Sequence, residues 1–108
     1  MIKELYKLKF MFDWGSGVCL WSANKCAEDK FGDYPIISSE LPVSEELKEK
    51  LDELTGWHDE ALNWKDPAGE LLWDDTQICE FLMAAKKIYL AVCDELGEEY
   101  EVEFIDHM

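Results

Sequence analysis

Carboxylates and indole rings gather in one stretch of the sequence, between Ser44 and Asp75. Trp57, Trp64 and Trp73 fall within seventeen residues, beside the densest acidic side chains. Free carboxylates form charge-assisted hydrogen bonds with Lys and Arg, and indole faces attract the same cations. We therefore predict a recognition surface for a basic partner, with packing at the core edge as the competing interpretation for each tryptophan. The predicted members are Glu45, Glu49, Asp52, Glu53, Glu60, Trp64, Asp66, Trp73, Asp74 and Asp75.

Residue types used in catalytic and metal sites are present, but they do not have the spacing of a known site. His58 precedes Asp59 and Glu60, yet it falls on the apolar face of its predicted helix, which favours a buried core histidine over a base or a ligand. His107, one residue from the end, is expected to fray. With two histidines and no H-E-x-x-H spacing, we expect neither a metal nor a cofactor.

Gly15-Ser16-Gly17 follows a predicted strand and could belong to a phosphate loop or a nucleophile elbow. Neither G-x-x-x-x-G-K-S/T nor G-x-S-x-G is present, and a hairpin turn explains both glycines. Asp66, Asp74 and Asp75 lack the spacing of a calcium-binding loop. A pair of carboxylates that hydrolyses glycosidic bonds remains an alternative. With twenty-five acidic residues in the chain, however, the presence of such pairs does not predict a glycosidase. We do not expect an enzyme.

A helix that begins after Ser44 is expected to hold most of these carboxylates outward. Projected at about 100° per residue, its sequence separates an apolar face from an acidic face. Glu46 can pair with Lys50 and Lys48 with Asp52, but most carboxylates of the acidic face have no partner within the helix. The apolar face contains Val43, Leu47, Leu51, Leu54, His58, Ala61 and Leu62, and the acidic face contains Glu45, Glu49, Asp52, Glu53 and Glu60.

Gly56 is the weak point of this helix, because a glycine often forms the C-terminal cap of a helix. The apolar positions keep their helical phase beyond it. We therefore predict one continuous helix from Ser44 to Asn63, with a break at Gly56 as the alternative.

A second long helix is predicted after residues 65–69, whose proline and glycine cannot continue the first. Asp74 with Gln77 resembles a capping box, and Thr76 is an alternative cap. A broad apolar arc predicts that this helix, which ends at Gly97, is the most buried of the protein. The arc contains Ile78, Phe81, Leu82, Ala85, Ile88, Tyr89, Val92 and Leu96 and is widened by Cys79, Met83 and Leu90.

Alternation of apolar and polar residues predicts strands at both ends of the chain. Apolar side chains occupy the even positions from Tyr6 to Trp14, and residues 18–21 resume a β-prone run after the glycine turn, which predicts a hairpin. A final strand is predicted over residues 98–106, with glutamates outward. Its inward side chains are Tyr100, Val102 and Phe104.

The middle of the chain completes the predicted fold. Ser22 or Asn24 caps a short helix that stops at Gly32, and two prolines make residues 33–42 an irregular connector. The order β-β-α-α-α-β predicts a single α+β domain over residues 1–108. Its small antiparallel-type sheet, formed by the N-terminal hairpin and the C-terminal strand, is covered by two longer helices and one short helix.

The net charge of −15 comes from one part of the chain. Residues 1–39 contain five lysines and five acidic residues, whereas residues 40–108 contain five lysines and twenty acidic residues. Arginine, the residue best suited to bidentate phosphate recognition, is absent from the sequence. A field of this sign repels nucleic acids and anionic membranes and attracts basic proteins. The competing explanation is that the acidic surface only keeps a small protein soluble.

Cysteine usage and the N-terminal segment predict a reduced protein of the cytoplasm. Cys19, Cys26, Cys79 and Cys93 contain no C-x-x-C pair. The last two lie on one predicted helix, roughly 21 Å apart at about 1.5 Å per residue, which is too far for a disulfide. The alternating segment MIKELYKLKF is neither a signal peptide nor a membrane span.

Three stretches resemble a known class of protein: FMFDWGSGVCLWS at residues 10–22, LPVSEEL at residues 41–47, and LNW at residues 62–64 before a loop that ends in Trp73. They are similar to small acidic immunity proteins of bacterial contact-dependent growth-inhibition and polymorphic toxin systems. The resemblance covers most of the chain. It implies a cytoplasmic protein that binds the toxic C-terminal domain of a cognate effector, often a basic nuclease, and blocks its active site or substrate groove. We expect a monomer before binding.

Two other functions stay open from the sequence. An acidic adaptor or nucleic-acid mimic that binds another basic protein has the same composition as an immunity protein. A small enzyme would need a pocket with convergent, perturbed groups, and nothing in the sequence specifies one. A closed cleft around His58 would favour the enzyme.

Overall fold

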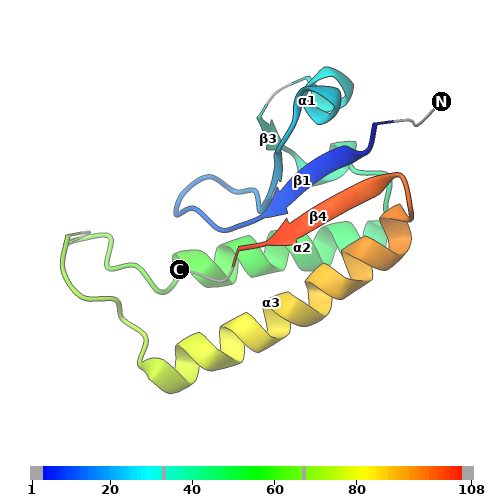
Figure 1. The fold of residues 1–108 in the computed structure, drawn as a ribbon. Coiled ribbons are helices and arrows are strands. Elements are labelled where there is room, and N and C mark those ends of the chain that lie inside the picture. The colour runs from blue at the N-terminus through cyan, green and yellow to red at the C-terminus, as the bar shows by residue number, and fades with distance from the viewer. Residues whose placement is uncertain (1–3, 33, 67, 106–108) are drawn as a thin grey trace.

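The computed structural model describes residues 4–32, 34–66 and 68–105 (Figure 1). Predictions made for Asp33, Pro67, Asp106 and His107, and for the first three residues, lie outside the described residues. The strands are β1 (Tyr6–Phe10), β2 (Leu20–Ser22), β3 (Pro35–Ile36) and β4 (Tyr100–Phe104). The helices are α1 (Lys25–Phe31), the short 3-10 helix η1 (Ser38–Glu40), α2 (Glu45–Asp59) and α3 (Asp75–Leu96).

The strands form one mixed sheet in the order β3-β2-β1-β4. β1 pairs antiparallel with β2, where Leu8 lies opposite Ser22, and parallel with β4, where Leu8 lies opposite Val102. The predicted α+β fold and the antiparallel hairpin pair are confirmed. The direction of β4 differs from the predicted antiparallel arrangement. β4 runs parallel to β1, because α3 carries the chain back along the sheet before β4 begins. The number of strands also differs, because the segment expected to be irregular contributes β3, which pairs with β2.

The connection between β1 and β2 is longer than the predicted turn. β1 ends at Phe10 rather than at Trp14. Beyond it, the rings of Phe12 and Trp14 stack on His58 of α2, with centroid distances of 5.1 and 4.6 Å. Packing against the helix thus replaces strand pairing for these two aromatic residues. The turn itself is confirmed within Gly15–Gly17, where both glycines have positive φ angles, 80° and 73°.

Polar caps start each helix close to where the sequence predicts. Asn24, rather than Ser22, caps α1, and Ser44 caps α2. Each accepts a hydrogen bond from the amide three residues later, at 2.9 and 3.2 Å. Asp74 and Gln77 form the predicted capping box at the start of α3. The beginnings of all three helices are therefore set by local side-chain chemistry.

α2 runs through Gly56 without a break, as predicted, but it ends at Asp59 rather than at Asn63. The amide of Ala61 donates to the carbonyl three residues before it (3.0 Å), so the chain tightens after the helix. The carbonyl of Ala61 then accepts a hydrogen bond from the amide of Leu72 (2.8 Å). Contact with the returning loop therefore replaces the last helical turn that the sequence predicts.

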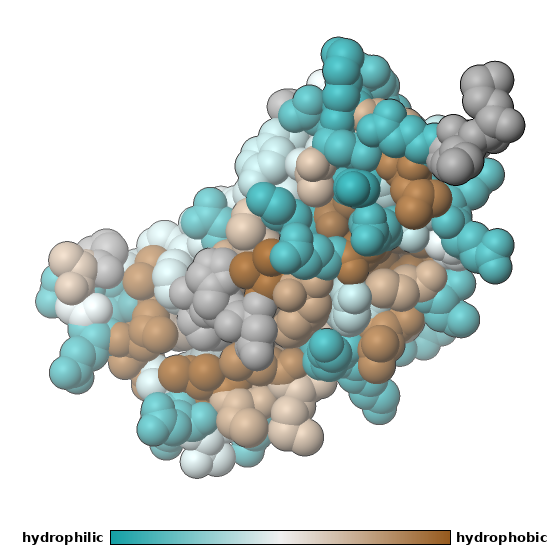
Figure 2. All heavy atoms as spheres, in the orientation of Figure 1, coloured by the Kyte–Doolittle hydropathy of each residue, from teal (hydrophilic) through white to brown (hydrophobic). Residues whose placement is uncertain are grey.

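The expectation that α3 is the most buried helix is wrong. Met83 and Leu90, which widen its apolar arc, are 69% and 57% exposed. One side of this 22-residue helix packs on α2 and β4, and no element of the described chain covers the other side. Figure 2 shows apolar side chains on the visible surface where α3 lies. The buried residues of α3 are Phe81, Ala85, Val92 and Leu96.

The core lies between the sheet and the two long helices (Figure 1). Leu8 and Phe10 of β1 and Val102 of β4 are buried on the helix side. Alternate positions carry charges on the opposite face, where Lys7 and Glu101 form an ion pair at 3.8 Å. This packing fixes which side of α2 faces solvent. The helices contribute mainly Leu47, Leu51, Leu54, Phe81, Ala85 and Val92.

Candidate binding surface

The outer side of α2 presents a line of carboxylates. Glu45, Glu49 and Glu53 follow each other at four-residue intervals, which places them on one side of the helix, and all three are exposed. The opposite side of α2 is anchored in the core by three buried leucines. The direction of the three carboxylates is therefore set by core packing. We call Glu45, Glu49 and Glu53 the acidic ridge.

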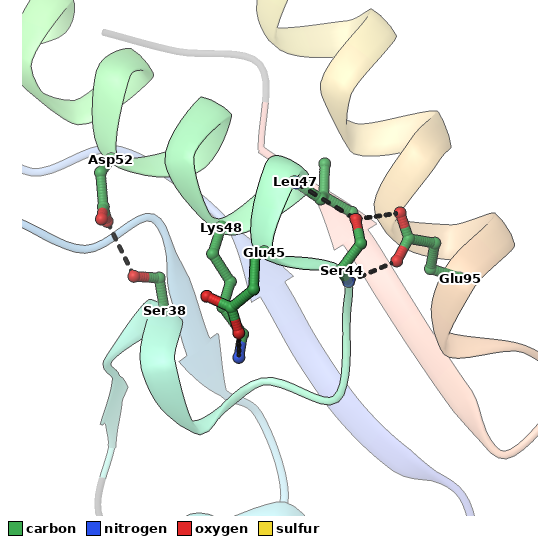
Figure 3. Close-up of polar contacts among 7 residues, drawn as sticks. All are labelled: Ser38, Ser44, Glu45, Leu47, Lys48, Asp52 and Glu95. Carbon is green, nitrogen blue, oxygen red and sulfur yellow. Dashed lines mark hydrogen bonds and ion pairs between the residues drawn. The ribbon is translucent and has the colours of Figure 1, made fainter.

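Lysines of the same helix neutralise part of this charge. Glu46 pairs with Lys50 at 3.3 Å, as predicted. Lys48 pairs with Glu45 at 3.0 Å instead of with Asp52, so that prediction is wrong (Figure 3). Each exposed ion pair at i,i+3 or i,i+4 stabilises the helix by about a few tenths of a kcal/mol.

Asp52 and Glu53 turn to opposite flanks of α2. The carboxylate of Asp52 accepts a hydrogen bond from the Ser38 hydroxyl of η1 at 2.8 Å (Figure 3). Glu53 instead lines a groove toward α3 with Lys87. Successive helical side chains point about 100° apart, so Asp52 faces η1 whereas Glu53 faces α3. Within the described residues, Glu49 and Glu53 form no ion pair and no side-chain hydrogen bond.

The end of α2 binds the loop that follows β1. The Asp59 carboxylate accepts a hydrogen bond from the amide of Gly15, and the Asp59 carbonyl accepts one from the indole N–H of Trp64, both at 3.0 Å. Trp64 is held in this way and is still 55% exposed. Glu60 and Asp66, on either side of it in the sequence, are also exposed. Three predicted members therefore lie on the turn that leaves α2.

Trp73 lies in a different environment. It is half-buried, and its ring centroid is 5.4 Å from that of Phe81 and 5.9 Å from that of Trp57. Packing at the core edge thus describes Trp73 better than Trp64. Asp74 accepts the hydrogen bond that caps α3, and Asp75 is exposed in the first turn of that helix. The ten predicted residues therefore occupy α2, the turn after α2, and the start of α3.

Two residues of this region, Trp57 and Asp59, are not among the ten members that the sequence predicts, although Trp57 belongs to the tryptophan cluster noted there. Trp57 lines the groove between α2 and α3 and contacts Trp73. Trp57 and Trp64 are seven residues apart, which places both at the same edge of the predicted helix. This spacing could have added Trp57 to the predicted members. Asp59 reaches Gly15 across 44 residues. A contact of that range leaves no local signal in the sequence.

His58 belongs to the core and not to a site. It is 1% exposed and lies between the rings of Phe12 and Trp14, so the predicted core histidine is confirmed. The Trp14 indole N–H also donates to the His58 carbonyl at 3.0 Å. The rings of Phe12, Trp14 and Phe81 all contact the His58 imidazole.

The cysteines offer no reactive group in the interior. Burial, together with the smaller effect of the negative charge of Asp52, raises the pKa of the Cys19 thiol to about 12. This thiol is therefore protonated and unreactive at neutral pH. The four cysteines are free. Over the described ranges, we find no cluster of three acidic, His or Cys side chains fit to bind a metal ion, and no helix with the length and apolarity of a membrane span.

A family model described as Serratia CdiI immunity protein-like matches residues 6–107, which include every strand and helix of the fold. This chain belongs to that family. The resemblance to immunity proteins is confirmed, and the Serratia CdiI immunity protein-like family gives the chain an immunity role in contact-dependent growth inhibition. None of the curated proteins matches this sequence. Membership of the family implies that the partner is a cognate toxin domain.

Proposed function

We propose that this immunity protein neutralises a basic toxin domain, a nuclease, through the acidic ridge and the exposed turn after α2. The observation that carries the proposal is the state of Glu49 and Glu53, which are exposed on a rigid helix and have no ion pair in the described chain. A nuclease must bind phosphates and therefore has a cationic groove. Carboxylates held in line on a helix compete for that groove.

The net charge of −15 supports the same proposal through kinetics. Charge complementarity can bring association rates to about 10⁸–10⁹ M⁻¹s⁻¹ at low salt. A fast encounter suits a protein that must capture a lethal enzyme before it acts. We place this encounter in the cytoplasm, with the immunity protein as a monomer and without a catalytic step of its own.

Charge reversal of the ridge tests the proposal. We expect the double variant Glu49→Lys and Glu53→Lys to slow association with the toxin domain about tenfold at low salt and to flatten its salt dependence. The matched control reverses Glu28 and Glu98, which are exposed and lie outside α2, and changes the net charge equally. Stopped-flow association rates over a series of salt concentrations provide the measurement. Equal rates for the two double variants would rule out the ridge.

Growth rescue separates immunity from the competing function of an acidic adaptor or nucleic-acid mimic. Co-expression with the cognate toxin domain should restore growth to cells that the toxin domain alone inhibits, and the two should copurify in a fixed ratio. Loss of rescue, together with copurification of a different basic protein, would favour the adaptor.

A further inference from the structure

A groove of about 350 Å³ runs between α2 and α3. On α2 its lining residues follow a helical stripe, and a matching stripe of α3 faces them. The small side chain of Ala84 leaves space in the floor of the groove. The floor is apolar and the rims are charged: Leu54, Trp57, Ala84 and Ile88 line the floor, and Glu53 and Lys87 stand on the rims.

Two tryptophans beside this groove have unused hydrogen-bond donors. The indole N–H groups of Trp14, Trp21 and Trp64 each donate to a backbone carbonyl, at 3.0, 2.9 and 3.0 Å. In the described chain, Trp57 and Trp73 form no such hydrogen bond, and both residues are half-buried. Tryptophan at a protein interface usually buries its ring and gives its N–H to the partner. The Trp57 and Trp73 rings already contact each other and Phe81. Their two N–H donors, and the part of Trp57 that lines the groove, are available to a second molecule.

The charges around the groove define the chemistry of that molecule. Lys50 on the α2 rim is held by Glu46 at 3.3 Å, whereas Glu53 is exposed and has no counterion in the described chain. The α2 rim is therefore negative and continuous with the acidic ridge. Lys87 makes the α3 rim positive, so a cation should bind on the side of Glu53 and Trp57.

On the basis of the proposed function, we propose that this groove receives a lysine or arginine side chain of the toxin domain. Its aliphatic stem would lie against Leu54, Ala84 and Ile88, and its cationic head would pair with Glu53 over the indole face of Trp57. An anchor of this kind slows dissociation, whereas the acidic ridge speeds association. Glu53 belongs to both surfaces, so a variant that changes the groove and leaves the ridge intact is needed to isolate the anchor.

Filling the groove tests the anchor. Ala84→Arg places a positive charge and a long side chain in the groove, and Leu90→Arg adds the same residue to an exposed position of the same helix. We expect Ala84→Arg to raise the dissociation rate from the toxin domain at least about tenfold, and Leu90→Arg to change it less than about twofold. Glu53→Gln, which keeps the shape of the side chain, should also raise the dissociation rate and needs no change in packing. Thermal unfolding verifies that each variant is folded.

Indole resonances provide a second, direct observation. In the full chain labelled with ¹⁵N at its tryptophans, adding the unlabelled toxin domain should shift the N–H signals of Trp57 and Trp73. The signal of Trp21 should stay in place, because that group already donates to Met11. Unchanged Trp57 and Trp73 signals in a complex that forms normally would overturn the groove inference. Failure of the toxin domain to bind at all would overturn the proposed function as well.

Discussion

Glu95 ties the end of α3 to the start of the helix that carries the acidic ridge. Its carboxylate accepts hydrogen bonds from the backbone amide of Ser44 at 2.6 Å and from the Ser44 hydroxyl at 3.1 Å (Figure 3). The same hydroxyl accepts a hydrogen bond from the amide of Leu47 at 3.2 Å. Glu95 therefore supports the cap and places a negative charge at the positive end of the α2 dipole. Glu95→Ala removes both effects.

The size of the loss follows from these contacts. A hydrogen bond to a charged group is worth about 1.5–3 kcal/mol, and the dipole contributes about 0.3–1 kcal/mol at an exposed site. Glu95 is exposed, so in the variant water can hydrogen-bond to the Ser44 groups and recover part of the lost stabilisation. We expect Glu95→Ala to lower the free energy of unfolding by about 1–1.5 kcal/mol. In a chain of this length that corresponds to a drop of about 5 °C in Tm.

Thermal and urea unfolding, followed by circular dichroism, measure this loss. Asp94→Ala is the matched control, because Asp94 is an exposed neighbour that forms no side-chain hydrogen bond in the described chain. Glu95→Gln keeps an acceptor oxygen but no charge, so it should lower the free energy of unfolding less than Glu95→Ala does. If Glu95→Ala unfolds within about 0.3 kcal/mol of Asp94→Ala, the Glu95–Ser44 contact does not stabilise the fold.

Gly56→Ala should stabilise the protein by about 0.5–1 kcal/mol in urea unfolding, because Gly56 lies inside α2 and a Cβ there meets no atom within 4 Å. Gly17→Ala should do the opposite, because Gly17 has a φ of 73°; equal effects would contradict both assignments. In alkylation at pH 8, exposed Cys79 should react in the folded protein and buried Cys19 only after unfolding. The pKa of Cys19 is raised from 9.0 to about 12, so the thiol ionises at a lower pH in the unfolded chain than in the folded protein. The contribution of this buried thiol to the free energy of unfolding is therefore complete below pH 9 and is lost between pH 9 and about 12. Urea unfolding at pH 8 and 10 measures this fall.

Features decided within a few residues were predictable from the sequence. Ser44 and Asp74 cap their helices because a short polar side chain reaches the amide three residues later. The helix continues through Gly56 because the apolar positions before and after it share one phase. The turn at Gly15–Gly17 needed positive φ angles, which glycine adopts without strain.

Features decided by distant residues were not. α2 stops early because the carbonyl of Ala61 meets the amide of Leu72. Lys48 could pair with either of two acids, and Ser38, from another segment, engages Asp52. The exposure of the predicted acids follows from periodicity, but their division among α2, the following turn and α3 depends on how the helices pack. The contact between Trp57 and Trp73 has the same origin.

The acidic ridge is unfavourable for the helix that carries it. Glu45, Glu49 and Glu53 form successive like-charge pairs at i,i+4, each of which costs about 0.2–0.5 kcal/mol. Lys48 relieves Glu45 at 3.0 Å, but in the described chain no lysine pairs with the other two. A helix optimised for stability alone would have a lysine at position 49. Glu49→Lys should therefore raise the free energy of unfolding by about 0.5–1 kcal/mol while it slows association with the toxin domain. A variant that loses stability as well as association rate would show instead that its binding defect comes from folding, and the ridge would have no role of its own.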